Sequence, residues 1–158
     1  MRKRIITQDT QHDPSSKAED WLDVENLAQA ELTSEDATHP IESALKPGAG
    51  SGWRASETGQ QTVRLLFDTP LRIKRIHLEF LEPAQQRTQE FLLQWSSDQG
   101  RSFQEIVRQQ FNFSPPAATR EIEDYDVDIA EMTVLEIRIS PDISGGCAHA
   151  TIAALRLA

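Results

Sequence analysis

From residue 62 onward, apolar and polar side chains alternate along the chain with a period of two residues. Val63, Leu65 and Phe67 follow this alternation, and residues 91–95 repeat it. Successive side chains of a β-strand point to opposite faces of the sheet, so this period predicts strands that are buried on one side. No segment after residue 46 shows the period of an amphipathic helix. The chain is therefore expected to fold mainly as antiparallel sheet.

Turn-forming sequences separate these strand segments. Residues 68–70 read Asp-Thr-Pro and are expected to end the first strand. The parity of the apolar residues then changes, and one extra residue near Lys74-Arg75, a β-bulge, keeps both flanking sets on the core face. Further strands are expected at residues 91–95, 103–113, 125–129, 135–139 and 151–157. Short strands at this spacing predict an all-β antiparallel β-sandwich.

One hairpin carries a recognisable local motif. Residues 96–103 match the pattern of an Asp box, with Ser96, Asp98, Gly100, Ser102 and Phe103 at its fixed positions. In such a turn the aspartate accepts hydrogen bonds from backbone amides, the glycine takes a positive φ and the aromatic ring packs beneath. A single copy predicts a stable hairpin and indicates no ligand.

The length of 158 residues fits one domain. Residues 1–20 contain almost no large apolar side chain and are expected to form a disordered N-terminal tail, so the sandwich is assigned to residues 21–158. The net charge is −9, and residues 21–45 hold six acidic side chains and no Lys or Arg. Nucleic acid is therefore an unlikely partner.

The single cysteine, Cys147, excludes an intramolecular disulfide and a zinc site built from several thiolates. The basic start is followed at once by polar residues, so no signal peptide is expected. No apolar run reaches the length of a bilayer span, and no membrane association is expected. These features predict a cytoplasmic location.

Several segments together resemble the galactose-binding-like superfamily, which includes discoidin, coagulation factor 5/8 type C and carbohydrate-binding-module domains. The resemblance rests on residues 33–45, on Gly52-Trp53-Arg54-Ala55, on the strand at 62–67 and on a closing strand at 150–157. It implies an eight-stranded jelly roll, a binding fold whose loops at one end contact glycans, lipids, nucleic-acid ends or proteins. Intraflagellar-transport and strand-break-repair scaffold members begin with similar strings, so the fold does not fix the ligand.

The resemblance also implies two features near Trp53. In the family this tryptophan packs under the loops, so it is expected in the core. Many members hold a structural calcium ion just before it, but here Lys46 and Pro47 stand where a carboxylate ligand would fall. Because calcium takes six to eight oxygen ligands, the calcium site is not favoured, and no cofactor is expected.

Two segments, residues 82–90 and 108–116, place arginine and amide side chains where strands are expected to meet loops. Sugar hydroxyls need planar donors and amides of this kind. The alternative is that these arginines pair with nearby acids. Phe111 and Phe113 continue the parity of the core residues and are expected to be buried. The candidate ligand-binding residues are Arg54, Arg87, Arg108, Gln109 and Asn112.

Nothing in the chain predicts catalysis. Cys147 and His149 are two residues apart in an extended segment, and no third group is evident that would orient them. Asp124, Asp126 and Asp128 share one strand face, as solvated carboxylates do. The sequence therefore predicts a non-catalytic binding module that takes carbohydrate through the loops at one end of the sandwich. The alternative is a cytoplasmic adaptor that binds a protein partner.

Overall fold

The computed structural model describes residues 20–48 and 50–158. Apart from Asp20, the tail predicted at residues 1–20 lies outside the described residues. The elements are α3 (Val24–Leu27), β1 (Ala28–Leu32), α4 (Glu42–Leu45), β2 (Trp53–Thr58), β3 (Gln61–Leu81), β4 (Arg87–Ser96), β5 (Gln104–Phe113), β6 (Arg120–Ser140), β7 (His149–Ile152) and β8 (Ala154–Leu157). The predicted all-β antiparallel sandwich is confirmed. In this described part, no helix has the length and apolar character needed to cross a membrane.

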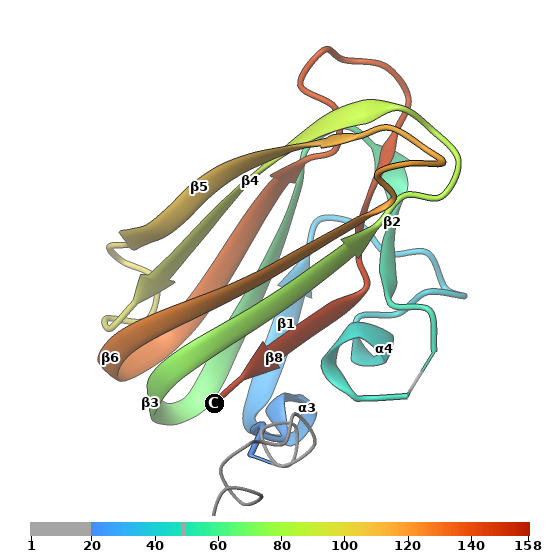
Figure 1. Cartoon of the computed structure of the whole chain (residues 1–158). Coiled ribbons are helices and arrows are strands. Elements are labelled where there is room, and N and C mark those ends of the chain that lie inside the picture. Colours follow the sequence, from blue (N-terminus) through green and yellow to red (C-terminus); the bar gives the residue numbers. More distant parts are fainter. Residues whose placement is uncertain (1–19, 49) are drawn as a thin grey trace, which may run out of the picture.

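Two long strands contribute to both layers of the sandwich. β3 and β6 pair antiparallel, and Figure 1 shows both of them turning over at the lower left. Ahead of its bend, β3 lies between β1 and the second half of β6, in a layer that continues through β4 to β5. Beyond the bend, β3 pairs with β8 and with the first half of β6. Both layers thus share the same two strands.

The bends account for a difference from the sequence prediction. Residues 68–70 do not end a strand, because β3 continues through them while its pairing with β6 is interrupted between Leu66 and Leu71. Likewise, the strands predicted at 125–129 and 135–139 are parts of the single strand β6. The predicted irregularity near Lys74-Arg75 is confirmed, since the register shifts between Ile73 and Arg75.

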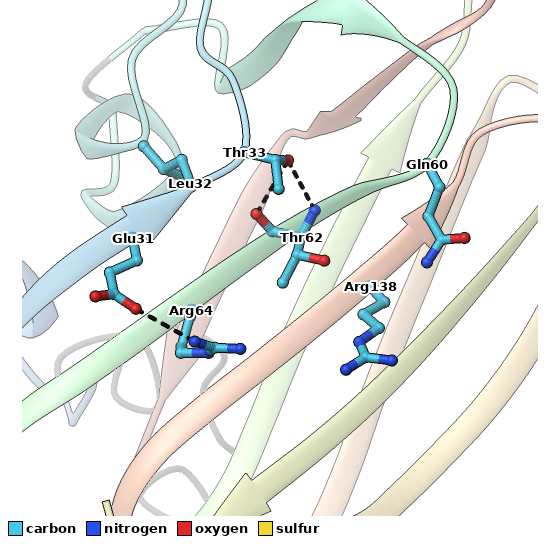
Figure 2. A pocket seen from close by; sticks show the side chains of 7 residues that line it. All are labelled: Glu31, Leu32, Thr33, Gln60, Thr62, Arg64 and Arg138. Carbon is cyan, nitrogen blue, oxygen red and sulfur yellow. Dashed lines mark hydrogen bonds and ion pairs between the residues drawn. The ribbon is translucent and has the colours of Figure 1, made fainter. Parts of the chain in front are cut away.

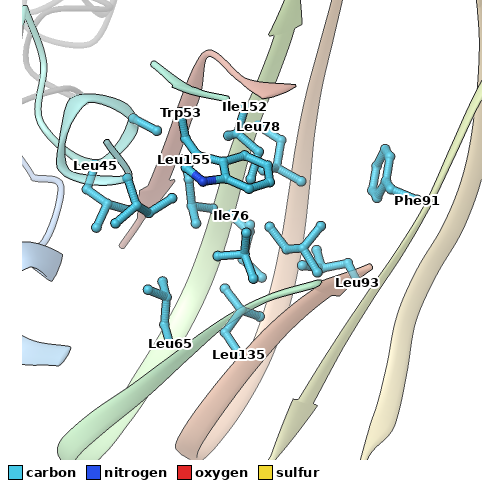
Figure 3. Close-up of a cluster of buried hydrophobic side chains, with 14 of the residues drawn as sticks. Leu45, Trp53, Leu65, Ile76, Leu78, Phe91, Leu93, Leu135, Ile152 and Leu155 are labelled. Carbon is cyan, nitrogen blue, oxygen red and sulfur yellow. The ribbon is translucent and has the colours of Figure 1, made fainter. Parts of the chain in front are cut away.

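Apolar side chains from both layers meet in one core, shown in Figure 3. Trp53 is only 1% exposed and lies beside Ile152 and Leu155, so its predicted burial is confirmed. Phe113 is fully buried and Phe111 packs against the core, as their parity predicts. The core therefore holds the short ribbon of β2 and β7 against the longer strands.

Gly52 fixes how closely β2 approaches the strand it faces. Its φ is +90°, and a Cβ at this position would lie 2.4 Å from the carbonyl oxygen of Ile152. We expect Gly52→Ala to lower the free energy of unfolding by about 2 kcal/mol, from backbone strain and from displacement of β7. Gly59 has a φ of +81° with open space around it. Gly59→Ala should therefore cost less in urea denaturation, and equal losses would contradict the steric argument.

The hairpin between β4 and β5 has the geometry that its motif predicts. Ser96 Oγ donates to Asp98 at 2.6 Å and accepts from the Gly100 amide at 2.9 Å. The hydroxyl of Ser102 donates to the other Asp98 oxygen at 2.6 Å. Hydrogen bonds from Ser102 and Ser96 lower the pKa of Asp98 to about 2. The motif is satisfied within the turn and needs no ligand to explain it.

Candidate functional site

The loops at one end of the sandwich are held together by backbone hydrogen bonds, and Figure 1 shows them gathered at the upper right. The Glu82 amide donates to the Thr119 carbonyl at 2.8 Å, which joins the loop after β3 to the loop after β5. The Ile143 amide donates to the Thr88 carbonyl at 2.8 Å and fixes the loop after β6. Backbone hydrogen bonds therefore join these loops into one continuous surface.

A pocket of about 300 Å³ opens among these loops, and we call it the loop-end pocket. Its walls come from three separate parts of the chain: Arg54 on β2, residues 81–85, and residues 147–149 with Thr151. Arg54 and Thr151 are direct partners in the pairing of β2 with β7. Because their neighbours Trp53 and Ile152 point into the core, the alternation of the strands turns Arg54 and Thr151 toward the pocket.

Three polar groups of the loop-end pocket have hydrogen-bonding capacity that the described protein atoms do not use. Arg54 is exposed and makes no ion pair or side-chain hydrogen bond within residues 20–48 and 50–158. Thr151 Oγ1 is buried and has no hydrogen-bond partner there. His149 Nδ1 lies 3.0 Å from the Ala55 carbonyl, which only accepts, so the neutral ring keeps Nε2 as a free acceptor. The pocket thus presents a donor fork and an acceptor, with the Thr151 hydroxyl buried in its wall.

Glu82 holds the pocket loop in place, and both of its carboxylate oxygens accept hydrogen bonds from the protein. One carboxylate oxygen accepts from Arg87 Nε at 2.7 Å, and the other accepts from the amides of Ala84 and Gln85 at 3.1 Å each. Burial alone would raise the pKa of Glu82, but these hydrogen bonds outweigh it and lower the pKa. The protein's own hydrogen bonds therefore define the conformation of this loop.

The structure corrects the predicted role of Arg87. Its side chain has no exposed surface, and its Nη1 atom donates to the Pro141 carbonyl at 2.7 Å and to Gln89 at 3.2 Å. The guanidinium also lies 4.6 Å from the centre of the Phe113 ring. Arg87 therefore lies behind the loop-end pocket as a structural residue, and no surface of it faces a ligand.

The three candidates on β5 do not lie at the loop-end pocket. Arg108 and Asn112 are exposed on the outer face of the sheet, where Arg108 pairs with Glu90 at 2.9 Å. Asn112 accepts from the Thr88 hydroxyl at 2.6 Å. Gln109 points the other way, into the sandwich, where its side-chain oxygen accepts from the Tyr125 hydroxyl at 2.6 Å. Of the five predicted residues, only Arg54 lines the loop-end pocket.

His149 and Thr151 were not among the predicted candidates. The strand from 149 to 152 alternates in burial, with its even-numbered residues buried. This alternation is visible in the sequence as His-Ala-Thr-Ile, so the polar partners of Arg54 follow from a two-residue period once β2 and β7 are paired. The pairing itself is what the sequence does not show.

The stretch where the resemblance implies a calcium ion carries an ion pair. Lys46 Nζ lies 2.7 Å from Glu25 Oε2, and this contact raises the pKa of Lys46. Over residues 20–48 and 50–158, no group of three or more His, Cys, Asp or Glu side chains is placed to hold a metal ion.

The architecture is a jelly-roll β-sandwich with a pocket among the loops at one end. Comparison with solved structures gives the same fold class. The chain has the fold of galactose-binding-like domains, which confirms the expectation from the resemblance. It is similar to the family 32 carbohydrate-binding module of Clostridium perfringens NanJ in complex with galactose. The TM-score is 0.63 and the identity 14%, over 87% of this chain and 96% of that one.

Two further solved structures show how widely the fold is used. A pectin-binding carbohydrate-binding module matches with a TM-score of 0.60 and 15% identity, over 83% of this chain and 89% of the module. Reduced XRCC1 bound to the DNA polymerase β catalytic domain matches with a TM-score of 0.56 and 14% identity, over 81% of this chain and 92% of that one. No protein-family model and no curated protein matches the chain. At these identities the likeness establishes the fold.

Proposed function

We propose that this protein is a non-catalytic binding module that takes a carbohydrate in the loop-end pocket. The observation that carries the proposal is the pair of unused polar groups on Arg54 and His149 in one concave site. The galactose complex of the NanJ module and the pectin-binding module support the same class of ligand.

A sugar ring fits the chemistry of these groups. Each hydroxyl both donates and accepts, so adjacent hydroxyls can accept from the Arg54 fork while one of them donates to His149 Nε2. Leu81 is 39% exposed at the rim and, with Pro83, offers an apolar surface to the C–H face of the ring. Among the residues that the structure describes, no Phe, Tyr or Trp side chain lines the pocket. We therefore expect weak binding of a single sugar, with affinity rising when more than one unit is bound.

The placement of the reactive groups supports a role without catalysis. Cys147 is exposed and makes no hydrogen bond to His149 among the described residues, and the Nδ1 atom of His149 is occupied by a backbone carbonyl. Asp124 bonds to Arg75 and His77 on the outer face, at 3.1 Å and 2.8 Å. A nucleophile with its base and orienting group is therefore not assembled in the described part of the chain.

Replacing Arg54 with alanine tests the proposal. We expect Arg54→Ala to abolish glycan-array signals and to weaken binding in calorimetry about tenfold or more, because the donor fork is lost. The melting temperature should stay unchanged, since the guanidinium has no protein partner among the described residues. Arg101→Ala, in the hairpin between β4 and β5, is the matched control and should bind normally. Full binding by Arg54→Ala, or an array with no signal for the wild type, would disprove the proposal.

The second candidate function is binding of a protein partner. Leu81 and Ile122 are 39% and 50% exposed, and their strands pair so that they are diagonal neighbours on the outer face of β3 and β6. Two exposed apolar side chains form a small patch for an interface. If the glycan array is silent and a stoichiometric partner is lost when Ile122 is changed to aspartate, the adaptor function replaces the carbohydrate one. The cytoplasmic location stays a prediction in either case.

A further inference from the structure

A second hollow lies on the outer face of the sheet formed by β1, β3 and β6, and we call it the outer-face groove. Its volume is about 340 Å³, and Figure 2 shows the side chains that surround it. They are Glu31, Leu32, Thr33, Gln60, Thr62, Arg64 and Arg138. The two arginines come from adjacent strands, because Arg64 lies on β3 and Arg138 on β6.

A buried carboxylate beneath the groove holds both arginines in place. Glu136 has no exposed surface, and one of its oxygens accepts from Arg64 Nε at 2.9 Å and Nη2 at 2.5 Å. Its other oxygen accepts from Arg138 Nε at 2.9 Å and from Gln94 at 2.6 Å. All four hydrogen bonds come from groups on the neighbouring strands or on β6 itself. Glu136 is therefore a fixed anchor, and its pKa is lowered because these hydrogen bonds outweigh the effect of burial.

The two guanidinium groups differ in what they leave available. Arg64 uses its remaining Nη1 atom on Glu31 at 3.3 Å. Arg138 is bonded only through Nε, so within the described residues both of its Nη atoms have no acceptor. Its side chain is 47% exposed, and Figure 2 shows its guanidinium at the groove. Arg138 thus presents a fork that is already oriented, the arrangement that binds a carboxylate through two parallel hydrogen bonds.

We propose that the outer-face groove binds the carboxylate of a uronate unit in a glycan chain that extends from the loop-end pocket. This inference rests on the proposed carbohydrate function and adds to it the chemical class of the ligand. Arg138 receives the carboxylate, while the Thr62 hydroxyl and the Gln60 amide lie beside it for the hydroxyls of the same ring.

A third hollow shares a lining residue with the groove and another with the loop-end pocket. It has a volume of about 280 Å³ under the loop of residues 140–146. Gln60 lines both this hollow and the outer-face groove, and Ala148 lines both this hollow and the loop-end pocket. The three depressions are therefore neighbours in this part of the protein, as the proposed course of a linear ligand requires.

The uncharged and acidic polar groups around the groove suit a glycan that carries hydroxyls beside its carboxylates. Glu31 is half exposed at the rim, where its carboxylate can accept hydrogen bonds from sugar hydroxyls. A uronate chain brings hydroxyls to every ring along with its carboxylates, so it uses both kinds of group in the groove.

Calorimetry with two forms of one ligand tests the proposal. The probe is an oligogalacturonate, and its comparison is the same oligomer with every carboxyl converted to a methyl ester. The wild type should bind the acid form roughly tenfold or more tightly than the ester, because only the free carboxylate accepts from the charged fork. Equal affinity for the two forms would overturn the proposal.

Substitution of Arg138 locates the effect. Arg138→Gln should reduce affinity for the acid form to that for the ester, with a near-normal melting temperature, because Arg64 and Gln94 still satisfy Glu136. Arg138→Lys keeps the charge without the fork and should also lose most of the preference. Arg72→Gln, a 56% exposed arginine paired with Asp128 near the bend, is the control and should keep it. An unchanged preference in Arg138→Gln would overturn the assignment to this groove.

The outcomes also separate this inference from the proposed function. If no carbohydrate of any kind binds, the carbohydrate function fails and the inference fails with it. If neutral and acidic glycans bind equally and depend on Arg54 alone, the proposed function stands and only the inference fails. Loss of the acid preference in Arg138→Gln, with binding of the ester retained, supports both.

Discussion

Arg87→Met is expected to lower the free energy of unfolding by about 3–5 kcal/mol, the usual cost of breaking a buried ion pair from one side. Arg87 has no exposed side-chain surface, and its loss leaves the Glu82 carboxylate without its 2.7 Å partner. The Pro141 carbonyl loses a hydrogen bond of 2.7 Å in the same step. Equilibrium urea denaturation at neutral pH measures the effect, and ligand binding at the loop-end pocket should weaken as well, because Glu82 orders that loop.

Arg108→Met is the matched control for Arg87→Met. Arg108 is also an arginine paired with a glutamate, but its side chain is 54% exposed and it lies on the outer face. An exposed pair of this kind contributes about 1 kcal/mol or less. If the two variants lose similar stability, the structural role given to Arg87 is wrong. A loss of glycan binding by Arg87→Met without any loss of stability would restore its role as a ligand-binding residue.

The position of Arg87 shows that the two-residue alternation predicts the burial of polar side chains as well as apolar ones. Arg87 and Gln89 have the same parity as Phe91 and Leu93, and all four are buried. The alternation that predicts the core strands therefore also places Arg87 inside the sandwich. Gln109 follows the same rule, because it shares the parity of Phe113. Their polar chemistry suggested that Arg87 and Gln109 lie on the ligand-binding surface. The two-residue period alone places both on the inner face of the sheet, where the structure has them.

The bends and the site depend on pairings that no local pattern contains. A turn-forming sequence at residues 68–70 predicts a strand end, yet β3 continues past it because β6 bends beside it. The loop-end pocket joins Arg54 to residues 81–85, residues 147–149 and Thr151, which are far apart in the chain. Only the register of β2 against β7 brings Arg54 opposite Thr151. Choosing candidates from individual segments therefore identified Arg54 but not His149 and Thr151, which line the same pocket.

Polar side chains continue from the loop end into the interior of the sandwich. Arg87 donates to Gln89, and Gln89 donates to Glu121 at 3.2 Å. Glu121 is 1% exposed, and its second carboxylate oxygen has no hydrogen-bond partner among the described residues. Glu123, on the same face of β6, accepts from Gln109. Two carboxyl groups thus lie close together in a mostly apolar interior, an arrangement in which one of them holds a proton.

This interior pair should make the stability of the protein depend on pH in an unusual direction. Burial, and next the neighbouring Glu123 carboxylate, raise the pKa of Glu121 from its ordinary value of 4.5 to about 8. Between these values the folded protein keeps a proton that the unfolded chain releases. The contribution of Glu121 to the free energy of unfolding is therefore fully present below its unfolded-state pKa of 4.5. This contribution is lost as pH rises through the folded-state pKa of about 8, with a slope of up to about 1.4 kcal/mol per pH unit.

Glu121→Gln removes the ionisable group and keeps the shape and the hydrogen bond with Gln89. We expect this variant to be close to the wild type in stability near pH 5 and more stable by a few kcal/mol above about pH 8, since its side chain never has to bury a charge. Urea denaturation across this range measures the difference between the two proteins.

Glu105→Gln, on an exposed side chain of β5, should leave the pH profile unchanged. If the wild type and Glu121→Gln lose stability in parallel as pH rises, Glu121 is already charged at neutral pH. The unpartnered oxygen would then have to be satisfied by bound water, and the ordered interior behind the loop-end pocket would rest on the Arg87 contacts alone.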